Sequence, residues 1–200
     1  MSNEEDTAYL ERLVHPERFQ TTSSVLDSVD GPIKGIYAWW FKSESLAAPV
    51  DGTIRARAGC LLYVGIGPSR ANSKRNLRKR LQDHINPDAS RSTLRRSLGC
   101  LLAESLQLRL RVTRTSNGGQ TLHCGLGEGE ATLSTWMANN SRISWIEHPE
   151  PWLLEQLALR RLTLPLNLDG NAHCAFSATL LRIREQHFAS AAKMYRDAGL

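Results

Sequence analysis

Two tyrosines, an arginine and a late carboxylate are the residues of this chain that could act together on a phosphodiester bond. Tyr37 and Tyr63 each stand in an apolar run typical of a strand, and Arg80 lies in a basic segment. A guanidinium can pair with a phosphate through two hydrogen bonds, and the carboxylate of Glu155 is the hard oxygen ligand that Mg²⁺ or Mn²⁺ prefers. A phenol can position water, or handle a proton where a cation lowers its pKa.

The elements that carry these residues can be predicted from apolar periodicity. Two strand-like runs, 33–41 and 60–66, are joined by a loop over 47–58, which favours an antiparallel pair with a long connection. A helix with a basic face follows at 74–85, because apolar residues recur there at helical spacing. The other expected elements are an N-terminal helix and linker up to about residue 28, a helix over 94–104, a hairpin of 106–113 and 121–124, a short helix over 129–139, a strand over 143–146, a helix over 152–161 and a long helix over 176–195.

The tripeptides Gly35-Ile36-Tyr37 and Tyr63-Val64-Gly65, followed in order by Arg80, Glu155 and Asn167, resemble the motifs of the GIY-YIG nuclease family. The resemblance implies an α+β fold with a small three-stranded antiparallel sheet flanked by helices. It also implies a divalent-metal-dependent endonuclease that hydrolyses DNA, with Mg²⁺ or Mn²⁺ as cofactor.

The resemblance also divides the chain. An N-terminal helix and linker are expected at 1–30, and the nuclease domain is expected at 31–172 with an inserted helix and hairpin segment at about 87–142. A C-terminal helix over 173–200 is expected to pack on the same domain.

The resemblance implies that four residues act in proton transfer and in binding of the phosphate. Tyr37 would help to activate the attacking water, and Tyr63 would orient water or phosphate. Arg80 would stabilise charge on the phosphorus. His84 lies one helical turn beyond Arg80 and would share the proton handling with Tyr37, and the sequence leaves open which of the two takes the proton.

The remaining roles belong to residues near the end of the motif. Glu155 is the expected metal ligand, with Glu147 and Glu150 as alternatives that could be solvated charges. Asn167 would tie the loop after the helix to the site through its amide, with Asn171 as the alternative in the same loop.

A local basic segment favours binding to a polyanion. The chain has a formal net charge of +5, yet nine basic and two acidic residues fall between Arg70 and Arg96. Such a cluster is typical of a nucleic-acid-binding surface, although a solvated helix face would have the same composition. The residues expected to contact the nucleic-acid backbone are Arg70, Lys74, Arg75, Arg78, Lys79, Arg95 and Arg96.

Other features narrow the class of protein. The four cysteines lie far apart without Cys-x-x-Cys spacing, which predicts neither a zinc site nor a disulfide framework. No apolar run is long enough to span a bilayer, and the N-terminus lacks an apolar signal core, so we expect a cytoplasmic protein.

DNA is the expected substrate, and a homodimer could cut both strands. Two alternatives stay open at this point. One is a catalytically silent nucleic-acid-binding module with the same fold, and the other is a nuclease that acts on RNA within a larger assembly.

Overall fold

An antiparallel sheet forms the centre of the protein, whose computed structural model describes residues 3–114 and 122–198. The strand order is β2-β3-β1-β6, so β1 lies inside the sheet between β3 and β6. The strands are β1 (Gly35–Phe41), β2 (Arg55–Ala56), β3 (Gly59–Gly67) and β6 (Ser141–Glu147).

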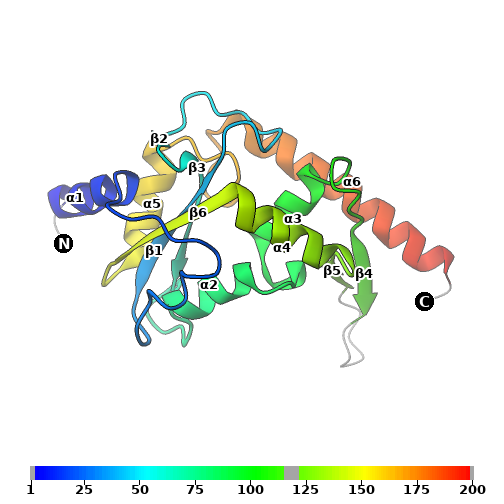
Figure 1. The fold of residues 1–200 in the computed structure, drawn as a ribbon, viewed down its shortest axis with the longest axis horizontal. Helices are drawn as coiled ribbons and strands as arrows, with labels where there is room; N and C mark the ends of the chain where they lie inside the picture. The colour runs from blue at the N-terminus through cyan, green and yellow to red at the C-terminus, as the bar shows by residue number, and fades with distance from the viewer. Residues whose placement is uncertain (1–2, 115–121, 199–200) are drawn as a thin grey trace.

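Helices cover both faces of this sheet, which is why every residue of β1 is buried (Figure 1). Even-numbered residues of β1 pack in a core with α1 (Asn3–Val14) and α5 (Pro151–Arg161). Odd-numbered residues of β1 pack in a second core with the helices α2, α3 and α4. Those helices span Leu77–Ile85, Thr93–Leu101 and Gly129–Asn140.

A smaller layer completes the molecule on the side of α3. The hairpin strands β4 (Arg111–Arg114) and β5 (Leu122–Gly125) pair in an antiparallel register, and a short 3-10 turn η1 (Ala89–Arg91) joins α2 to α3. The long C-terminal helix α6 (Ala175–Asp197) contacts both β4 and α3 (Figure 1).

The α+β fold with an antiparallel sheet is confirmed, and the differences from the sequence prediction are local. A fourth strand, β2, forms inside the predicted loop, where it pairs with the start of β3. The basic helix begins at Leu77 rather than at residue 74, because the Asn76 side chain accepts a hydrogen bond from the Lys79 amide and caps it there. The predicted Asn117-Gly118 turn lies outside the described residues.

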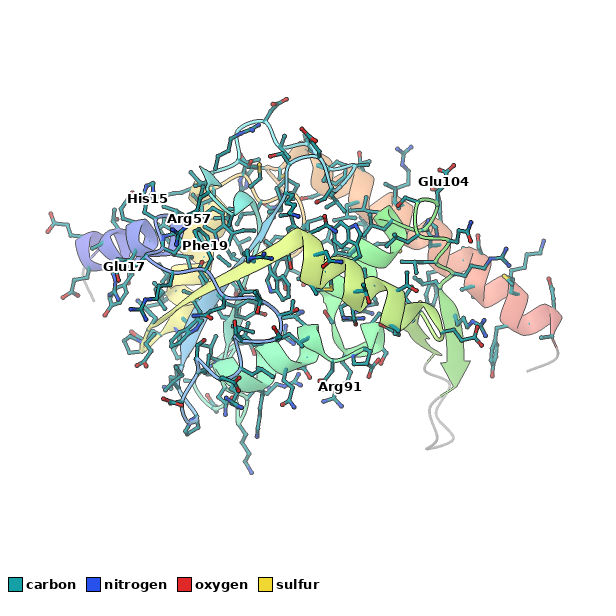
Figure 2. The ribbon with its side chains drawn as sticks, viewed as in Figure 1. His15, Glu17, Phe19, Arg57, Arg91 and Glu104 are labelled. Carbon is teal, nitrogen blue, oxygen red and sulfur yellow. The ribbon has the colours of Figure 1, made fainter. Side chains whose placement is uncertain are left out.

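The linker after α1 is fixed to the body of the protein. Gln20 forms a bridge with Ile143 of β6, and Arg57 lies over the Phe19 ring at 5.5 Å and donates to the Glu17 carbonyl (Figure 2). No helix within residues 3–114 and 122–198 has both the length and the apolar character needed to cross a bilayer.

Candidate active site

The two motif tyrosines meet on one face of the sheet because of the register between β1 and β3. Tyr37 pairs with Gly65, and the neighbouring pair on the same face is Trp39 with Tyr63, so the two tyrosines are diagonal neighbours. Their ring centroids are 6.4 Å apart. An irregularity in the pairing follows immediately after Trp39, and such bulges commonly redirect side chains beside active sites.

Gly65 makes room for one of these phenols. A Cβ atom at this position would clash with the hydroxyl of Tyr37 and would lie 2.5 Å from its Cζ atom. The ring of Tyr37 therefore crosses the sheet over a residue without a side chain. The second tripeptide supplies both a phenol and the space that the first phenol needs.

His84 connects Tyr37 to the inserted segment. It lies on the buried face of α2, with its Nε2 atom 2.6 Å from the Tyr37 hydroxyl and its Nδ1 atom 2.7 Å from Ser92 Oγ. Ser92 is the N-cap of α3 and accepts a hydrogen bond of 3.0 Å from the Arg95 amide.

These contacts determine which atoms of Ser92 and His84 carry a hydrogen. The Arg95 amide can only donate, so the one remaining acceptor for the buried Ser92 hydroxyl hydrogen, among the described residues, is His84 Nδ1. In the neutral imidazole the hydrogen then resides on Nε2 and is donated to the Tyr37 oxygen. Burial, followed by the charge of Arg80, holds the pKa of His84 well below its usual value, which keeps the ring neutral.

Both phenols keep their protons in the free protein. Burial raises the pKa of Tyr37 well above its usual value, and the neighbouring Tyr63 adds to this effect. Burial also raises the pKa of Tyr63 to about 12, while the charge of Arg80 opposes the shift in both cases. Ionisation of either phenol therefore requires more positive charge than Arg80 alone provides.

Arg80 lies where a phosphate could reach it. Its side chain is 24% exposed, and its NH1 atom is 3.5 Å from Asp83. The neighbouring Tyr37 raises the pKa of Arg80, burial lowers it and Tyr63 raises it again. The guanidinium is thus fixed between the two phenols and the solvent.

Glu155 provides the carboxylate of the same site. It lies on α5, a helix that begins at Pro151, between the buried residues Leu154 and Leu157. Burial raises the pKa of Glu155 to about 7, although the charge of Arg80 lowers it and that of Asp169 raises it further. The alternatives do not join this group, since Glu147 is exposed at the end of β6 and Glu150 is the N-cap residue of α5.

A divalent cation fits this carboxylate. Within the described residues there is no group of three His, Cys, Asp or Glu side chains that could enclose a metal. Mg²⁺ keeps several waters and is usually bound by one or two carboxylates together with substrate phosphate. The partly buried Glu155, near an arginine that a phosphate could reach, matches that kind of site, and its raised pKa shows that the charge of Arg80 compensates its burial only in part.

Asn167 occupies the outer edge of β3. Its side-chain oxygen accepts from the Val64 amide and its nitrogen donates to the Val64 carbonyl, both at 2.9 Å. The amide group thereby replaces a missing neighbouring strand at the residue between Tyr63 and Gly65. Asn171, the alternative, instead holds the loop together by donating to the carbonyls of Leu164 and Asn167.

The basic residues divide into solvent-facing and structural ones. Those with exposed side chains along the segment are Arg70, Lys74, Arg75, Arg78 and Lys79. Two of these side chains already have protein partners. Arg75 pairs with Asp83 at 2.5 Å, and Arg78 donates to the carbonyls of Leu26 and Val29 in the linker. Arg91, which the sequence did not assign, extends from the same surface and lies 3.4 Å from Asp83 (Figure 2).

Arg95 corrects a sequence prediction. It was expected to contact the nucleic-acid backbone, but the residue is 0% exposed. Its guanidinium forms an ion pair of 2.7 Å with Glu130 and donates to the His84 carbonyl at 3.3 Å. Arg95 therefore supports the helix that carries His84, and Arg96 lines a cavity between α3 and α6.

Ser92 and Asp169 are the site neighbours that the sequence did not assign. Ser92 was recognisable only as a helix cap, and its contact with His84 depends on how the insertion packs against α2. Asp169 follows Asn167 in the same loop, and its charge acts on both Glu155 and Tyr63. The order and types of the motif residues gave no signal for either one.

Comparison with known families agrees with this geometry. The model of the GIY-YIG catalytic domain matches residues 35–186, which include β1, β3, α2, α5 and the whole of the segment 87–142. Neither the curated proteins nor the solved structures gave a significant match. With the two tripeptides paired on adjacent strands and most of the chain matched, this protein belongs to the GIY-YIG catalytic-domain family of nucleases.

Proposed function

We propose that this protein is an endonuclease that hydrolyses DNA by in-line attack of water on phosphorus and depends on a divalent metal ion. The observation that carries the proposal is the continuous group formed by Ser92, His84, Tyr37 and Tyr63, which ends beside Arg80 and Glu155. A binding module without turnover would not require buried phenols in contact with a neutral imidazole and near a carboxylate whose charge is only partly compensated.

Phosphate binding is the first step of the proposed mechanism. Arg80 contacts the scissile phosphate, because it is the partly exposed guanidinium next to both phenols. Glu155 would hold a divalent cation, and such an ion would polarise the phosphate and stabilise the leaving oxygen. Asn167 holds the strand segment that carries Tyr63 in place.

The proton of the attacking water passes to the pair of phenols. Tyr63 is 7% exposed and Tyr37 is fully buried, so water reaches the pair from the side of Tyr63. One phenol first loses its own proton to solvent, and the phenolate is stabilised by Arg80 and by the Nε2 hydrogen of His84. The phenolate then takes the proton of the water as the water oxygen bonds to phosphorus and the bond from phosphorus to the leaving oxygen breaks. In this proposal the imidazole is a hydrogen-bond donor to the phenolate, and the base is phenolic.

Plasmid cleavage tests the proposal. Purified protein is incubated with supercoiled DNA in Mg²⁺, in Mn²⁺ and in EDTA, beside matched single-stranded RNA and DNA. We expect metal-dependent nicking that Glu155→Ala abolishes and that Arg80→Ala lowers by about 10²–10³-fold. Glu147→Ala, a change of the same charge at an exposed position, serves as the control. Cleavage by a folded Glu155→Ala protein would refute the site, and cleavage of RNA alone would refute the choice of DNA.

A further inference from the structure

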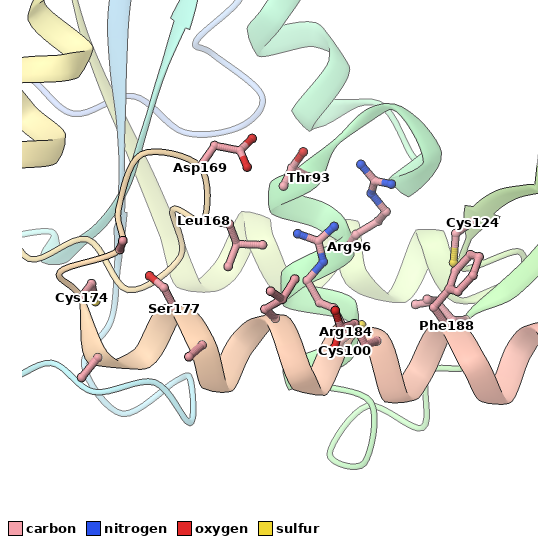
Figure 3. A pocket seen from close by; sticks show the side chains of 16 residues that line it. Thr93, Arg96, Cys100, Cys124, Leu168, Asp169, Cys174, Ser177, Arg184 and Phe188 are labelled. Carbon is pink, nitrogen blue, oxygen red and sulfur yellow. The ribbon is translucent and has the colours of Figure 1, made fainter.

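A cavity of about 760 Å³ lies between α3, α6 and the loop that precedes α6 (Figure 3). Its volume falls in the range of sites that enclose small ligands. Leu168, Leu181 and Phe188 contribute apolar surface, and the last two are 48% and 40% exposed. The mechanism proposed above uses none of these side chains.

Two arginines, Arg96 from α3 and Arg184 from α6, face this cavity (Figure 3). Among the described residues, neither guanidinium has a carboxylate within 4.0 Å, although Asp169 and Glu185 also border the cavity. The Nε atom of Arg96 is buried and has no hydrogen-bond partner there. In the described part of the chain, two half-buried cations therefore face one cavity without an ion-pair partner, and Asp169, the one carboxylate whose charge acts on Arg184, lies beyond ion-pair distance.

This arrangement costs free energy in the absence of a ligand. Burial lowers the pKa of Arg184, and the charge of Arg96 is the next largest cause. Like charges in a partly desolvated site repel each other more strongly than in water. An anion placed between the two guanidiniums would remove the repulsion and satisfy the open donors, and a phosphate suits their fork-shaped geometry.

The rest of the cavity indicates what the phosphate is attached to. An apolar wall that includes an aromatic ring provides a surface on which a nucleobase can stack. A free inorganic ion would leave that wall exposed to water. Phosphate and base together correspond to a nucleotide.

The cavity adjoins the active site through Asp169. This residue lines the cavity, and its charge also acts on Glu155 and Tyr63 across the loop. Asp169 thus links the cavity to the group of residues at which a strand would place its scissile phosphate.

We propose that this cavity binds an unpaired nucleotide of the substrate strand, with its phosphate between Arg96 and Arg184 and its base against Phe188. The inference rests on the proposed nuclease function, since it assigns the cavity to the same nucleic acid. The protein would then favour substrates in which a nucleotide next to the cut is unpaired or easily extruded. Extrusion of a base costs least at a bulge or in a single strand.

Binding in EDTA tests the inference without cleavage. Fluorescence anisotropy compares a labelled duplex carrying one bulged nucleotide, the fully paired duplex, a single strand and a free 5′-mononucleotide. We expect the bulged duplex and the single strand to bind more tightly than the paired duplex. Arg96→Gln and Arg184→Gln should each remove that preference, with about a tenfold loss of affinity for the bulged duplex.

Matched variants on the same helix provide the controls. Arg182→Gln removes the same charge from an exposed position outside the cavity and should change affinity by less than about twofold. Phe188→Ala should weaken binding of the bulged duplex, whereas Met194→Ala, which alters another exposed apolar residue, should not. The thermal midpoint of Arg184→Gln should equal or exceed that of the wild type, because repulsion is relieved.

The outcomes separate this inference from the function on which it rests. Equal binding and cleavage by Arg184→Gln, Arg182→Gln and the wild type would overturn the cavity assignment and leave the nuclease intact. Binding of the mononucleotide but not of the strands would overturn the assignment to the substrate. A dimer that Phe188→Ala dissociates without affecting nucleotide binding would show a protein interface instead. A wild type that neither binds nor cleaves nucleic acid would refute both proposals.

Discussion

Glu155→Gln should make the metal-free protein more stable, and the gain should depend on pH. Burial raises the pKa of this carboxyl from 4.5 to about 7, so between these values the native state binds more protons than the unfolded state. The free energy of unfolding therefore falls as the pH rises from about 4.5 to 7. At 1.36 kcal/mol per pKa unit, the charged carboxylate costs about 3 kcal/mol at pH 8. Glutamine keeps the shape without the charge.

Thermal and urea unfolding in EDTA at a series of pH values measures this difference. The variant and the wild type should be nearly equal in stability at about pH 4.5, and the variant should gain about 6–12 °C in thermal midpoint by pH 8. Glu147→Gln, at the exposed end of β6 before α5, should show no such difference from the wild type. At pH values above 7, addition of Mg²⁺ should raise the thermal midpoint of the wild type. The thermal midpoint of Glu155→Gln should not change, because only the carboxylate binds the ion.

A constant difference between the two proteins from pH 4.5 to pH 8 would refute the reasoning. It would mean that Glu155 is as well solvated in the folded state as in the unfolded chain. A stability difference between the two proteins that grows with pH but does not respond to Mg²⁺ would support the burial argument. It would exclude Glu155 as the metal ligand.

Three further substitutions test the surroundings of the site. Gly65→Ala should cost about 1–3 kcal/mol of stability in urea unfolding and abolish nicking, because the new methyl group displaces the ring of Tyr37. Glu130→Gln should cost about 3–5 kcal/mol, since it leaves the charge of the fully buried Arg95 uncompensated. Ser92→Ala should lower the cleavage rate about tenfold or more and change its pH profile, because the neighbouring imidazole is then free to adopt the other tautomer. An unchanged rate and pH profile in folded Ser92→Ala would contradict the proton assignment.

The sheet and most helices could be predicted because each has a strong local signal. β1 and β3 are continuous apolar runs, and such runs suit strands that are covered on both faces. β2 could not be predicted, because a two-residue strand exists only through its pairing with Gly59 and Cys60 of β3. The N-terminal end of α2 was misplaced for a related reason, since the capping contact of Asn76 determines it.

The candidate site was predictable where the motif fixes the geometry. Antiparallel pairing of the two tripeptides by itself brings Tyr37 and Tyr63 to one face. Arg95 could not be distinguished from its neighbours by composition, because its burial follows from the position of Glu130 in a helix 35 residues later. Arg184 lies still further along the chain, and only the packing of α6 against α3 places it beside Arg96.

The buried charges of this protein differ in how well they are compensated. This difference distinguishes a charge pair with a structural role from charges that a bound ligand would compensate. Arg95 and Glu130 satisfy each other, and the same carboxylate also accepts hydrogen bonds from the amides of Ala89 and Leu126. Removal of either partner would leave a buried charge uncompensated, and the intact pair needs no ligand. Glu155 and Arg184 are only partly compensated, so each shifts its pKa toward the neutral form. Folding alone gives no reason to keep either charge where it is. A cation at the first and a phosphate at the second would supply that reason, and a nucleic-acid strand crossing from Arg80 to the cavity would connect the two sites.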